Sequence, residues 1–208
     1  MNRLPTQPNA PALVLIGGPS CAGKTRLAWT LAQTWDASRA CVIALDSYYC
    51  CLAHLSHEER TRHNFDVPDA IEWPLAELHV RTLLCGEEIE TPVYDFTRHM
   101  RQPERMRVEP KPLIILEGLL ALCNPVLRDL SRVRVYVDAP DPVCFIRRQR
   151  RDISERGRSP ESVHAQYRAT VRPMAEQFVI PTRAYASVIV NGAGGVEDAV
   201  QRVMAELD

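Results

Sequence analysis

The chain has 208 residues, of which 46% are hydrophobic and 25% charged, and its formal net charge is −1 at pH 7. This length suits one well-buried domain rather than two. A charge so near zero argues against bulk attraction to nucleic acid or to a membrane surface. No apolar run approaches the ~18 residues that a membrane-spanning helix needs.

The first residues, MNRLPTQPNAP, are polar and rich in proline, and they lack the apolar core of a signal peptide. We expect residues 1–11 to form a flexible tail and residues 12–208 to form a single domain. The seven cysteines show no CxxC pair and no Cys/His spacing typical of a zinc site. Most of them are expected to be small buried side chains, which is typical of a reducing compartment, so we expect a cytoplasmic protein.

Alternating strand and helix patterns run along the chain. Short, continuously apolar segments predict buried parallel strands at 12–17, 41–45, 113–117, 133–138 and 187–190. Helical patterns lie at 24–35, 71–85, 141–155, 160–179 and 196–207. The alternation predicts an α/β fold with a doubly wound parallel sheet.

The region 46–110 is too long for a simple crossover, so we expect it to be an insertion that grips a substrate at the open end of the sheet. It holds a helical pattern and strand-like pieces at 88–96 and 106–109. Asp69 and Glu72 resemble a capping box, yet Pro74 cannot donate a helical hydrogen bond. The helix therefore either begins near Trp73 or kinks there.

The segment GPSCAGKT, residues 18–25, matches the phosphate-loop pattern G-x-x-x-x-G-K-[ST], and it follows an apolar strand and opens a helical pattern. Its backbone N–H groups and the helix N-terminus are expected to hold phosphates. Lys24 is expected to reach the β- and γ-phosphates and to act in catalysis, and Thr25 to bind Mg²⁺. Pro19 removes one N–H from this cradle. The residues assigned to the nucleotide here are Gly18, Ser20, Gly23, Lys24 and Thr25.

Two carboxylates follow strands at the edge where ligands bind in open α/β sheets. Glu117 ends the strand LIILE, and Asp46 follows the strand CVIAL. We interpret Glu117 as a partner of Mg²⁺, although a surface charge is the alternative. Asp46 is interpreted as a base for an incoming hydroxyl, with a turn-forming aspartate as the alternative.

The element N-K-x-D that reads guanine in signalling GTPases is absent, because the only lysine outside the loop is Lys111 in EPKPL. The remaining classes are a small-molecule kinase, a mechanical or regulatory ATPase, and a nucleotide-binding module without catalysis.

The segments GPSCAGKT, LDSYY, NFDVPDA, PVYDFTRHMR, LIILEGLLAL and RRDISERGRS, with residues 162–190, together resemble uridine (uridine–cytidine) kinases. The resemblance covers roughly residues 12–190. It implies a nucleoside-monophosphate-kinase-like phosphate-loop fold with a five-stranded parallel sheet and transfer of the ATP γ-phosphoryl group to the 5′-hydroxyl of uridine or cytidine. It also implies Mg²⁺, a role in pyrimidine salvage and a homotetramer. ATP is the expected donor, and GTP stays open.

The resemblance also implies roles for single residues. Asp46 would be the general base on the ribose 5′-hydroxyl and would lie close to Mg²⁺. Asp66 would accept hydrogen bonds from the ribose hydroxyls. Tyr94 and Phe96 would form the walls of a pyrimidine cup, and His99 would hydrogen-bond the edge of the base.

Residues 147–158, RRQRRDISERGR, hold six arginines and two acids. We interpret residues 147–166 as a lid over the phosphates, against the alternative of a solvated helix face that Asp152 and Glu155 pair with. Arg148 and Arg151 lie one turn apart and are expected to face ATP, while the unassigned arginines are expected on the surface. Gly157 fits a hinge or helix stop. The resemblance assigns to the nucleoside or phosphates Arg156, Arg158 and Gln166.

Other kinases of this superfamily, acting on ribulose phosphate, pantothenate or nicotinamide riboside, share the loop and the fold. We do not expect them to carry NFDVPDA together with PVYDFTRHMR. A regulator that binds nucleotide without turnover stays open if Pro19 or the pair Cys50–Cys51 disrupts the site. The segment NGAGGVED, residues 191–198, departs from the family pattern, which puts an adenine contact from this loop in doubt.

Overall fold

The computed structural model describes residues 11–207, so residues 1–10 of the expected tail lie outside the described part. The central sheet is parallel throughout, with strand order β2-β5-β1-β6-β7. Its strands are β1 Ala12–Gly17, β2 Ala40–Ala44, β5 Leu113–Glu117, β6 Val133–Asp138 and β7 Val188–Asn191. The predicted five-stranded parallel sheet is confirmed, and each strand lies within a single residue of its predicted bounds.

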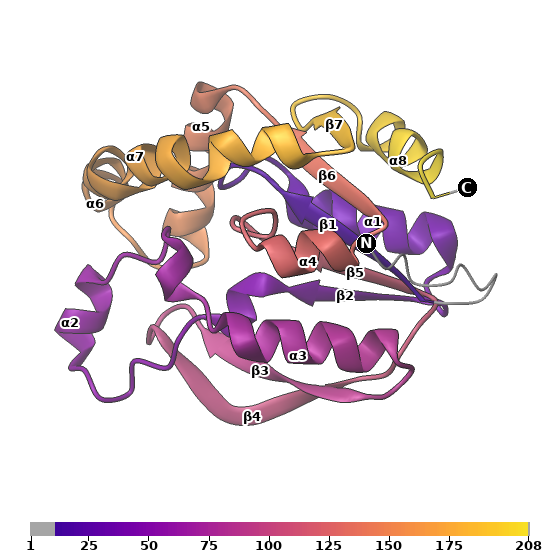
Figure 1. The fold of residues 1–208 in the computed structure, drawn as a ribbon. Helices are drawn as coiled ribbons and strands as arrows, with labels where there is room; N and C mark the ends of the chain where they lie inside the picture. Colours follow the sequence, from indigo (N-terminus) through magenta and orange to yellow (C-terminus); the bar gives the residue numbers. More distant parts are fainter. Residues whose placement is uncertain (1–10, 208) are drawn as a thin grey trace.

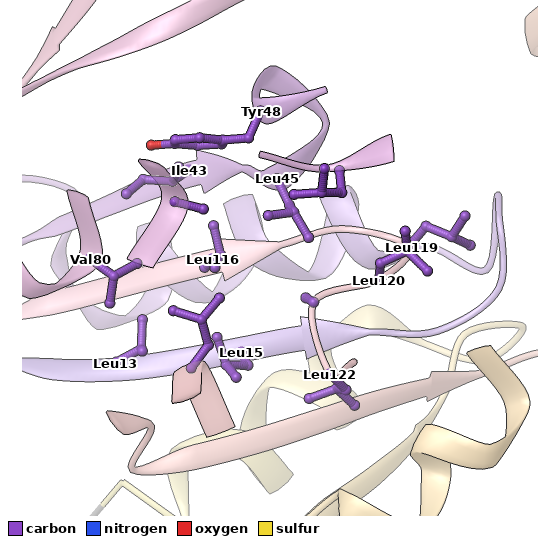
Figure 2. Packing of buried hydrophobic residues seen from close by; sticks show 14 of the residues in the cluster. Leu13, Leu15, Ile43, Leu45, Tyr48, Val80, Leu116, Leu119, Leu120 and Leu122 are labelled. Carbon is purple, nitrogen blue, oxygen red and sulfur yellow. The ribbon is translucent and has the colours of Figure 1, made fainter. Parts of the chain in front are cut away.

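Helices cover both faces of this sheet (Figure 1). On one face pack α1 Lys24–Asp36 and α8 Val196–Met204, and on the other α3 Trp73–Leu84 and α4 Pro125–Leu130. Figure 2 shows Leu15 of β1 and Leu116 of β5 packed near Val80 of α3, in the hydrophobic core on the face that α3 and α4 cover. Strands buried on both faces explain why their sequences are continuously apolar rather than alternating.

The insertion after β2 contains the 3₁₀ turns Leu45–Tyr48 and Pro68–Ala70, α2 His57–Arg62, α3, and an antiparallel hairpin of β3 Ile89–Asp95 and β4 Met100–Val108. In Figure 1 the insertion places α3 and the β3–β4 hairpin at the bottom of the view and α2 at the left. Strand β4 is longer than the predicted piece 106–109, since it begins at Met100, directly after the turn of the hairpin. Helices α2 and α4 were not predicted; α2 starts with a capping box of Ser56 and Glu59, a pattern visible in the sequence.

Helix α3 begins at Trp73, which decides between a helix start and a kink at that position. Pro74 lies in the first turn, where a missing N–H costs nothing. Glu72 is the residue before the helix and makes no side-chain cap; its carboxylate instead pairs with Arg101 of β4. The capping box of Asp69 and Glu72 is therefore not formed.

The region predicted as one helix over 160–179 is divided. After α5 Asp141–Ser154 follow α6 Pro160–Gln166, a π-turn over Tyr167–Val171, α7 Arg172–Met174, a second π-turn over Ala175–Val179 and a 3₁₀ turn over Ile180–Tyr185. Such π-turns occur mostly as local bulges and often lie at functional sites. Helix α8 also ends earlier than predicted, at Met204. Among the described helices, none is both long and apolar enough to cross a membrane.

Candidate active site

The register of the sheet aligns the three strand ends that carry polar groups. Glu117, the last residue of β5, pairs with Ile16 of β1 on one side and with Ala44 of β2 on the other. The phosphate loop after β1, Asp46 after β2 and Glu117 therefore meet at the carboxyl edge of the sheet, where ligands bind in this class of fold.

A pocket of ≈ 430 Å³ opens at this edge between the insertion and the arginine-rich segment. Its volume is in the range of small-molecule sites. The predicted site residues that line it are Ser20, Gly23, Lys24, Thr25, Asp46, Asp66, Tyr94, Phe96, His99, Glu117, Arg148, Arg151, Arg156, Arg158 and Gln166. Their individual roles stay predictions.

Gly18 is the one predicted site residue that does not line the pocket. Its φ is 137°, and a Cβ at this position would lie 2.4 Å from the backbone oxygen of Val137 in β6. Gly18 therefore lets the phosphate loop turn tightly against the neighbouring strand, rather than facing a ligand.

The phosphate loop is closed by contacts of its own side chains. Lys24 is 8% exposed, and its Nζ donates to the carbonyl oxygen of Pro19 at 2.8 Å. Pro19 thus gives up an N–H but holds the loop lysine through its carbonyl. The Thr25 hydroxyl donates to Glu117 Oε1 at 2.9 Å, which joins the loop to β5.

Acidic groups gather beside this loop. Burial raises the pKa of Glu117; Lys24 opposes the shift and Asp46 adds to it. Burial also raises the pKa of Asp66, with Arg148 opposing and Asp46 adding. The Asp46 charge therefore acts on both neighbouring carboxyl groups, and a cation would relieve this repulsion.

The oxygen donors of Thr25, Asp46 and Glu117 fit Mg²⁺, which binds proteins through one or two carboxylates and completes its shell with phosphates and water. In residues 11–207 no group of three or more His, Cys, Asp or Glu side chains could hold a metal ion by itself.

The segment PVYDFTRHMR forms the turn of the β3–β4 hairpin. The register shifts between Pro92 and Tyr94, and such a bulge re-aims a side chain. Asp95 Oδ1 accepts from the backbone N–H groups of Thr97 and Arg98 at 2.8 and 3.0 Å. Asp95 and Arg98 do not line the pocket, so they shape the turn.

Aromatic rings form a cup at this turn. Tyr94 packs edge-on against Phe96 at 5.2 Å between ring centroids, and His99 stacks on Phe65 at 5.3 Å with an interplanar angle of 14°. His99 holds a positive φ of 53°, a sparsely populated conformation that often marks a functional position. Phe65 is a further member of the cup that the sequence did not predict, and its position next to Asp66 in NFDVPDA is the only sequence signal for it.

The cup presents neutral polar groups. Burial, followed by the charges of Arg158 and His57, lowers the pKa of His99 to about 4, so its ring is neutral at pH 7 with one donor and one acceptor nitrogen. Tyr94 is 8% exposed, and its hydroxyl is buried with no hydrogen-bond partner among residues 11–207.

The arginine-rich segment is not a solvated helix face paired by Asp152. Asp152 is 0% exposed and lies within 4.0 Å of four guanidinium groups, those of Arg148, Arg151, Arg156 and Arg158. Sequence reasoning missed this carboxylate, because a lone acid in a basic run usually faces solvent. Glu155, the other acid of this segment, is exposed, as expected for a solvated helix face.

Arg147, expected on the surface with the unassigned arginines, also lines the pocket. Its Nη1 donates to the carbonyl oxygens of Gly192 and Ala22 at 2.9 and 3.4 Å. It thereby joins the phosphate loop to the loop between β7 and α8, where Asn191, Gly192 and Gly194 line the same pocket. The segment NGAGGVED therefore lies on the phosphate-loop side of the pocket, and whether it contacts adenine stays open.

The profile of the Phosphoribulokinase / Uridine kinase family matches residues 13–197. A curated protein named uridine kinase from Chloroflexus aurantiacus is 43% identical over 198 residues, which is 95% of this chain and 95% of that protein. Another uridine kinase, from Shewanella amazonensis, is 44% identical over 192 residues, covering 89% and 91% of the two chains.

Solved structures with the same fold include phosphoribulokinase from Rhodobacter spheroides, with a TM-score of 0.62, 15% identity, and coverage of 89% of this chain and 74% of that one. D-glycerate 3-kinase from Cryptococcus neoformans has a TM-score of 0.60 and 15% identity, with coverage of 83% and 80%. These similarities support the phosphate-loop kinase fold. The family profile and the matches to curated relatives over about nine-tenths of the chain or more show that the chain belongs to the phosphoribulokinase/uridine kinase family.

Proposed function

We propose that this protein transfers the γ-phosphoryl group of ATP to the 5′-hydroxyl of uridine or cytidine. The observation that carries the proposal is a single pocket in which a phosphate loop and an aromatic cup face one another, with Asp46 and Asp66 in the same pocket. The relatives named uridine kinase, which match nearly the whole chain, support the same acceptor class.

The nucleotide would bind at the phosphate loop with Mg²⁺ held by Thr25, Asp46 and Glu117. Bound Mg²⁺ supplies positive charge that neutralises the β- and γ-phosphate oxygens. Lys24 would leave the Pro19 carbonyl that it contacts now and reach the phosphates. The loops carrying Ala22 and Gly192, joined through Arg147, would bound the rest of the nucleotide.

The acceptor would lie between the two halves of the pocket. Asp46 would take the proton of the 5′-hydroxyl as this oxygen attacks the γ-phosphorus. The Asp66 carboxylate would accept hydrogen bonds from the ribose hydroxyls. Because phosphoryl transfer passes through a loose transition state, positioning and charge neutralisation contribute more than the strength of the base. Closure of the arginine lid would exclude water as a competing acceptor.

The base would be selected in the cup. Tyr94, Phe96 and Phe65 supply aromatic walls, and neutral His99 supplies one donor and one acceptor by tautomer. Such a group can pair with uracil O4 or with the cytosine amino group. A pocket built around hydrogen bonds rejects an analogue that lacks them far better than an apolar slot does, so purine nucleosides should be refused.

An ADP-release assay over uridine, cytidine, adenosine, guanosine and ribulose 5-phosphate tests the proposal. We expect turnover with the two pyrimidine nucleosides alone. Comparable kcat/KM for adenosine would refute the assigned cup, and turnover of ribulose 5-phosphate alone would place the protein in the other branch of its family. ATP binding without any turnover would make it a nucleotide-binding regulator. Homotetramer assembly remains a separate prediction, which light scattering of the purified protein measures.

A further inference from the structure

Asp152 on α5 is a carboxylate that neither the phosphate loop nor the aromatic cup contains, yet it lies between groups of both. It is 0% exposed. Burying a carboxylate is costly unless it is paired and hydrogen-bonded. Arg151 donates to its Oδ1 at 2.8 Å, and Arg158 donates to its Oδ2 at 3.0 Å. Both oxygens are thus occupied by arginines of the lid.

Two further arginines extend from Asp152 to the two sides of the pocket. Arg148 Nε lies 3.5 Å from Asp152 Oδ2, while its Nη1 donates to the Ser20 hydroxyl of the phosphate loop at 2.9 Å. Arg156 Nη1 lies 3.6 Å from Asp152 Oδ1, and its guanidinium carbon lies 4.7 Å from the centre of the Phe96 ring in the cup. One carboxylate therefore links the loop to the cup through two side chains.

The charge balance explains why one acid is needed here. Four guanidinium groups this close together repel one another, and a single carboxylate among them reduces the repulsion while leaving a surplus of positive charge. Burial raises the pKa of Asp152, but the charges of Arg148, Arg151 and Arg156 outweigh it and hold this pKa below the ordinary value. Asp152 is therefore ionised at neutral pH. Each guanidinium has five N–H groups, and those that donate neither to Asp152 nor to Ser20 or Gln166 remain for phosphate oxygens.

We propose that Asp152 is a positioning residue that couples nucleoside binding to nucleotide binding, by holding Arg156 against the cup and Arg148 against the phosphate loop in one arrangement. The proposal rests on the proposed function, since it takes uridine as the occupant of the cup. When uridine binds, it orders Phe96 and thereby holds Arg156 in place. Because Arg156 pairs with Asp152, the arginines that contact the triphosphate are then held in place as well. The coupling acts equally in both directions, because linkage between two binding sites is reciprocal.

The test is the uridine dissociation constant, measured by calorimetry with and without a non-hydrolysable ATP analogue. In the wild-type protein we expect the analogue to tighten uridine at least ~5-fold, the lower end of typical coupling between sites. In Asp152→Asn this ratio should fall to about one. The titrations are run under conditions in which circular dichroism shows each variant to be fully folded, because an analogue that shifts a reversible unfolding equilibrium would itself change the ratio.

Glu155→Gln is the matched control, since it removes the same charge from an exposed position three residues along the same segment. It should keep the wild-type ratio. If Asp152→Asn does not fold by circular dichroism, Arg156→Gln breaks the same link from the side of the cup and should also bring the ratio to about one.

Three results would overturn the inference: a wild-type ratio of one, an unchanged ratio in the folded Asp152 or Arg156 variant, or an equal loss in Glu155→Gln. Failure of the wild-type protein to bind uridine at all is a different result. It would overturn the proposed function and, with it, the inference that rests on it.

Discussion

Replacing Gly192 by alanine is expected to weaken the use of ATP about a hundredfold without touching any predicted site residue. A Cβ at this position would lie 2.0 Å from the carbonyl oxygen of Ala22 in the phosphate loop and 2.7 Å from Cγ1 of Val137. The first of these neighbours is backbone, so no side-chain rotation can relieve the clash.

The structure gives the size of the displacement. Real Cβ atoms essentially never approach another heavy atom closer than 3.0 Å, so the two loops must separate by about 1 Å. Misplacing a reacting group by about 1 Å costs on the order of 10²-fold in rate, which corresponds to about 2.7 kcal/mol. Separation also strains the contact of Arg147 with the Gly192 carbonyl, now at 2.9 Å.

The assay is the kcat/KM for ATP at saturating uridine, compared with the KM for uridine at saturating ATP. The first should fall and the second should change little, because the cup lies on the other side of the pocket. Gly194→Ala is the matched control in the same loop, since its nearest neighbour would be a side-chain atom of Asn191 at 3.4 Å. A folded Gly192→Ala protein with an unchanged kcat/KM for ATP would refute the reasoning, as would an equal loss in Gly194→Ala.

Other perturbations follow from the same geometry. Asp46→Asn should lower kcat by at least ~10², the usual cost of losing a general base; near-normal turnover in the assay would contradict the assigned role. Chelation by EDTA should abolish turnover and added Mg²⁺ restore it, and Thr25→Ala should raise the Mg²⁺ concentration needed by about tenfold; turnover in EDTA would show that no divalent ion is used. His99 has its pKa lowered from 6.5 to about 4 by burial and nearby positive charges. The unfolded chain thus binds more protons between these values, so the free energy of unfolding should fall as the pH drops from 6.5 towards 4. Urea unfolding should show a smaller fall in His99→Gln, and an equal fall in both proteins would argue against a neutral, buried ring.

Much of the fold follows from local sequence. Continuous apolar runs marked all five strands of the main sheet, because a strand covered on both faces has no polar side to show. Helix α2 has no buried residue, and α4 is only six residues long, so neither leaves a periodic apolar pattern in the sequence. The break of the predicted helix 160–179 had a sequence signal that the prediction did not use. Pro173 lies inside this stretch, just after the π-turn Tyr167–Val171, and a proline there has no N–H to donate to the carbonyl one turn earlier.

For the site, the phosphate loop, Asp46 and Glu117 were readable from position alone, because a motif next to a strand end fixes where its groups lie. The assignment of the cup relied on resemblance, and the stack of His99 on Phe65 came only from the structure. That contact joins residues far apart in the chain, and no local spacing encodes it.

The sequence by itself determined that this chain binds phosphate, which edge of the sheet does so, and which residues meet there, since these depend on short motifs and hydrophobic period. Only the tertiary structure decided which charged groups pair with one another and which backbone segments pack together. Asp152 among four arginines and Gly192 against Ala22 are contacts between α5, the lid and the two loops. Burial changes an acid in a basic run from a solvated group into a fixed partner, and burial is a property of the packed chain, not of the run.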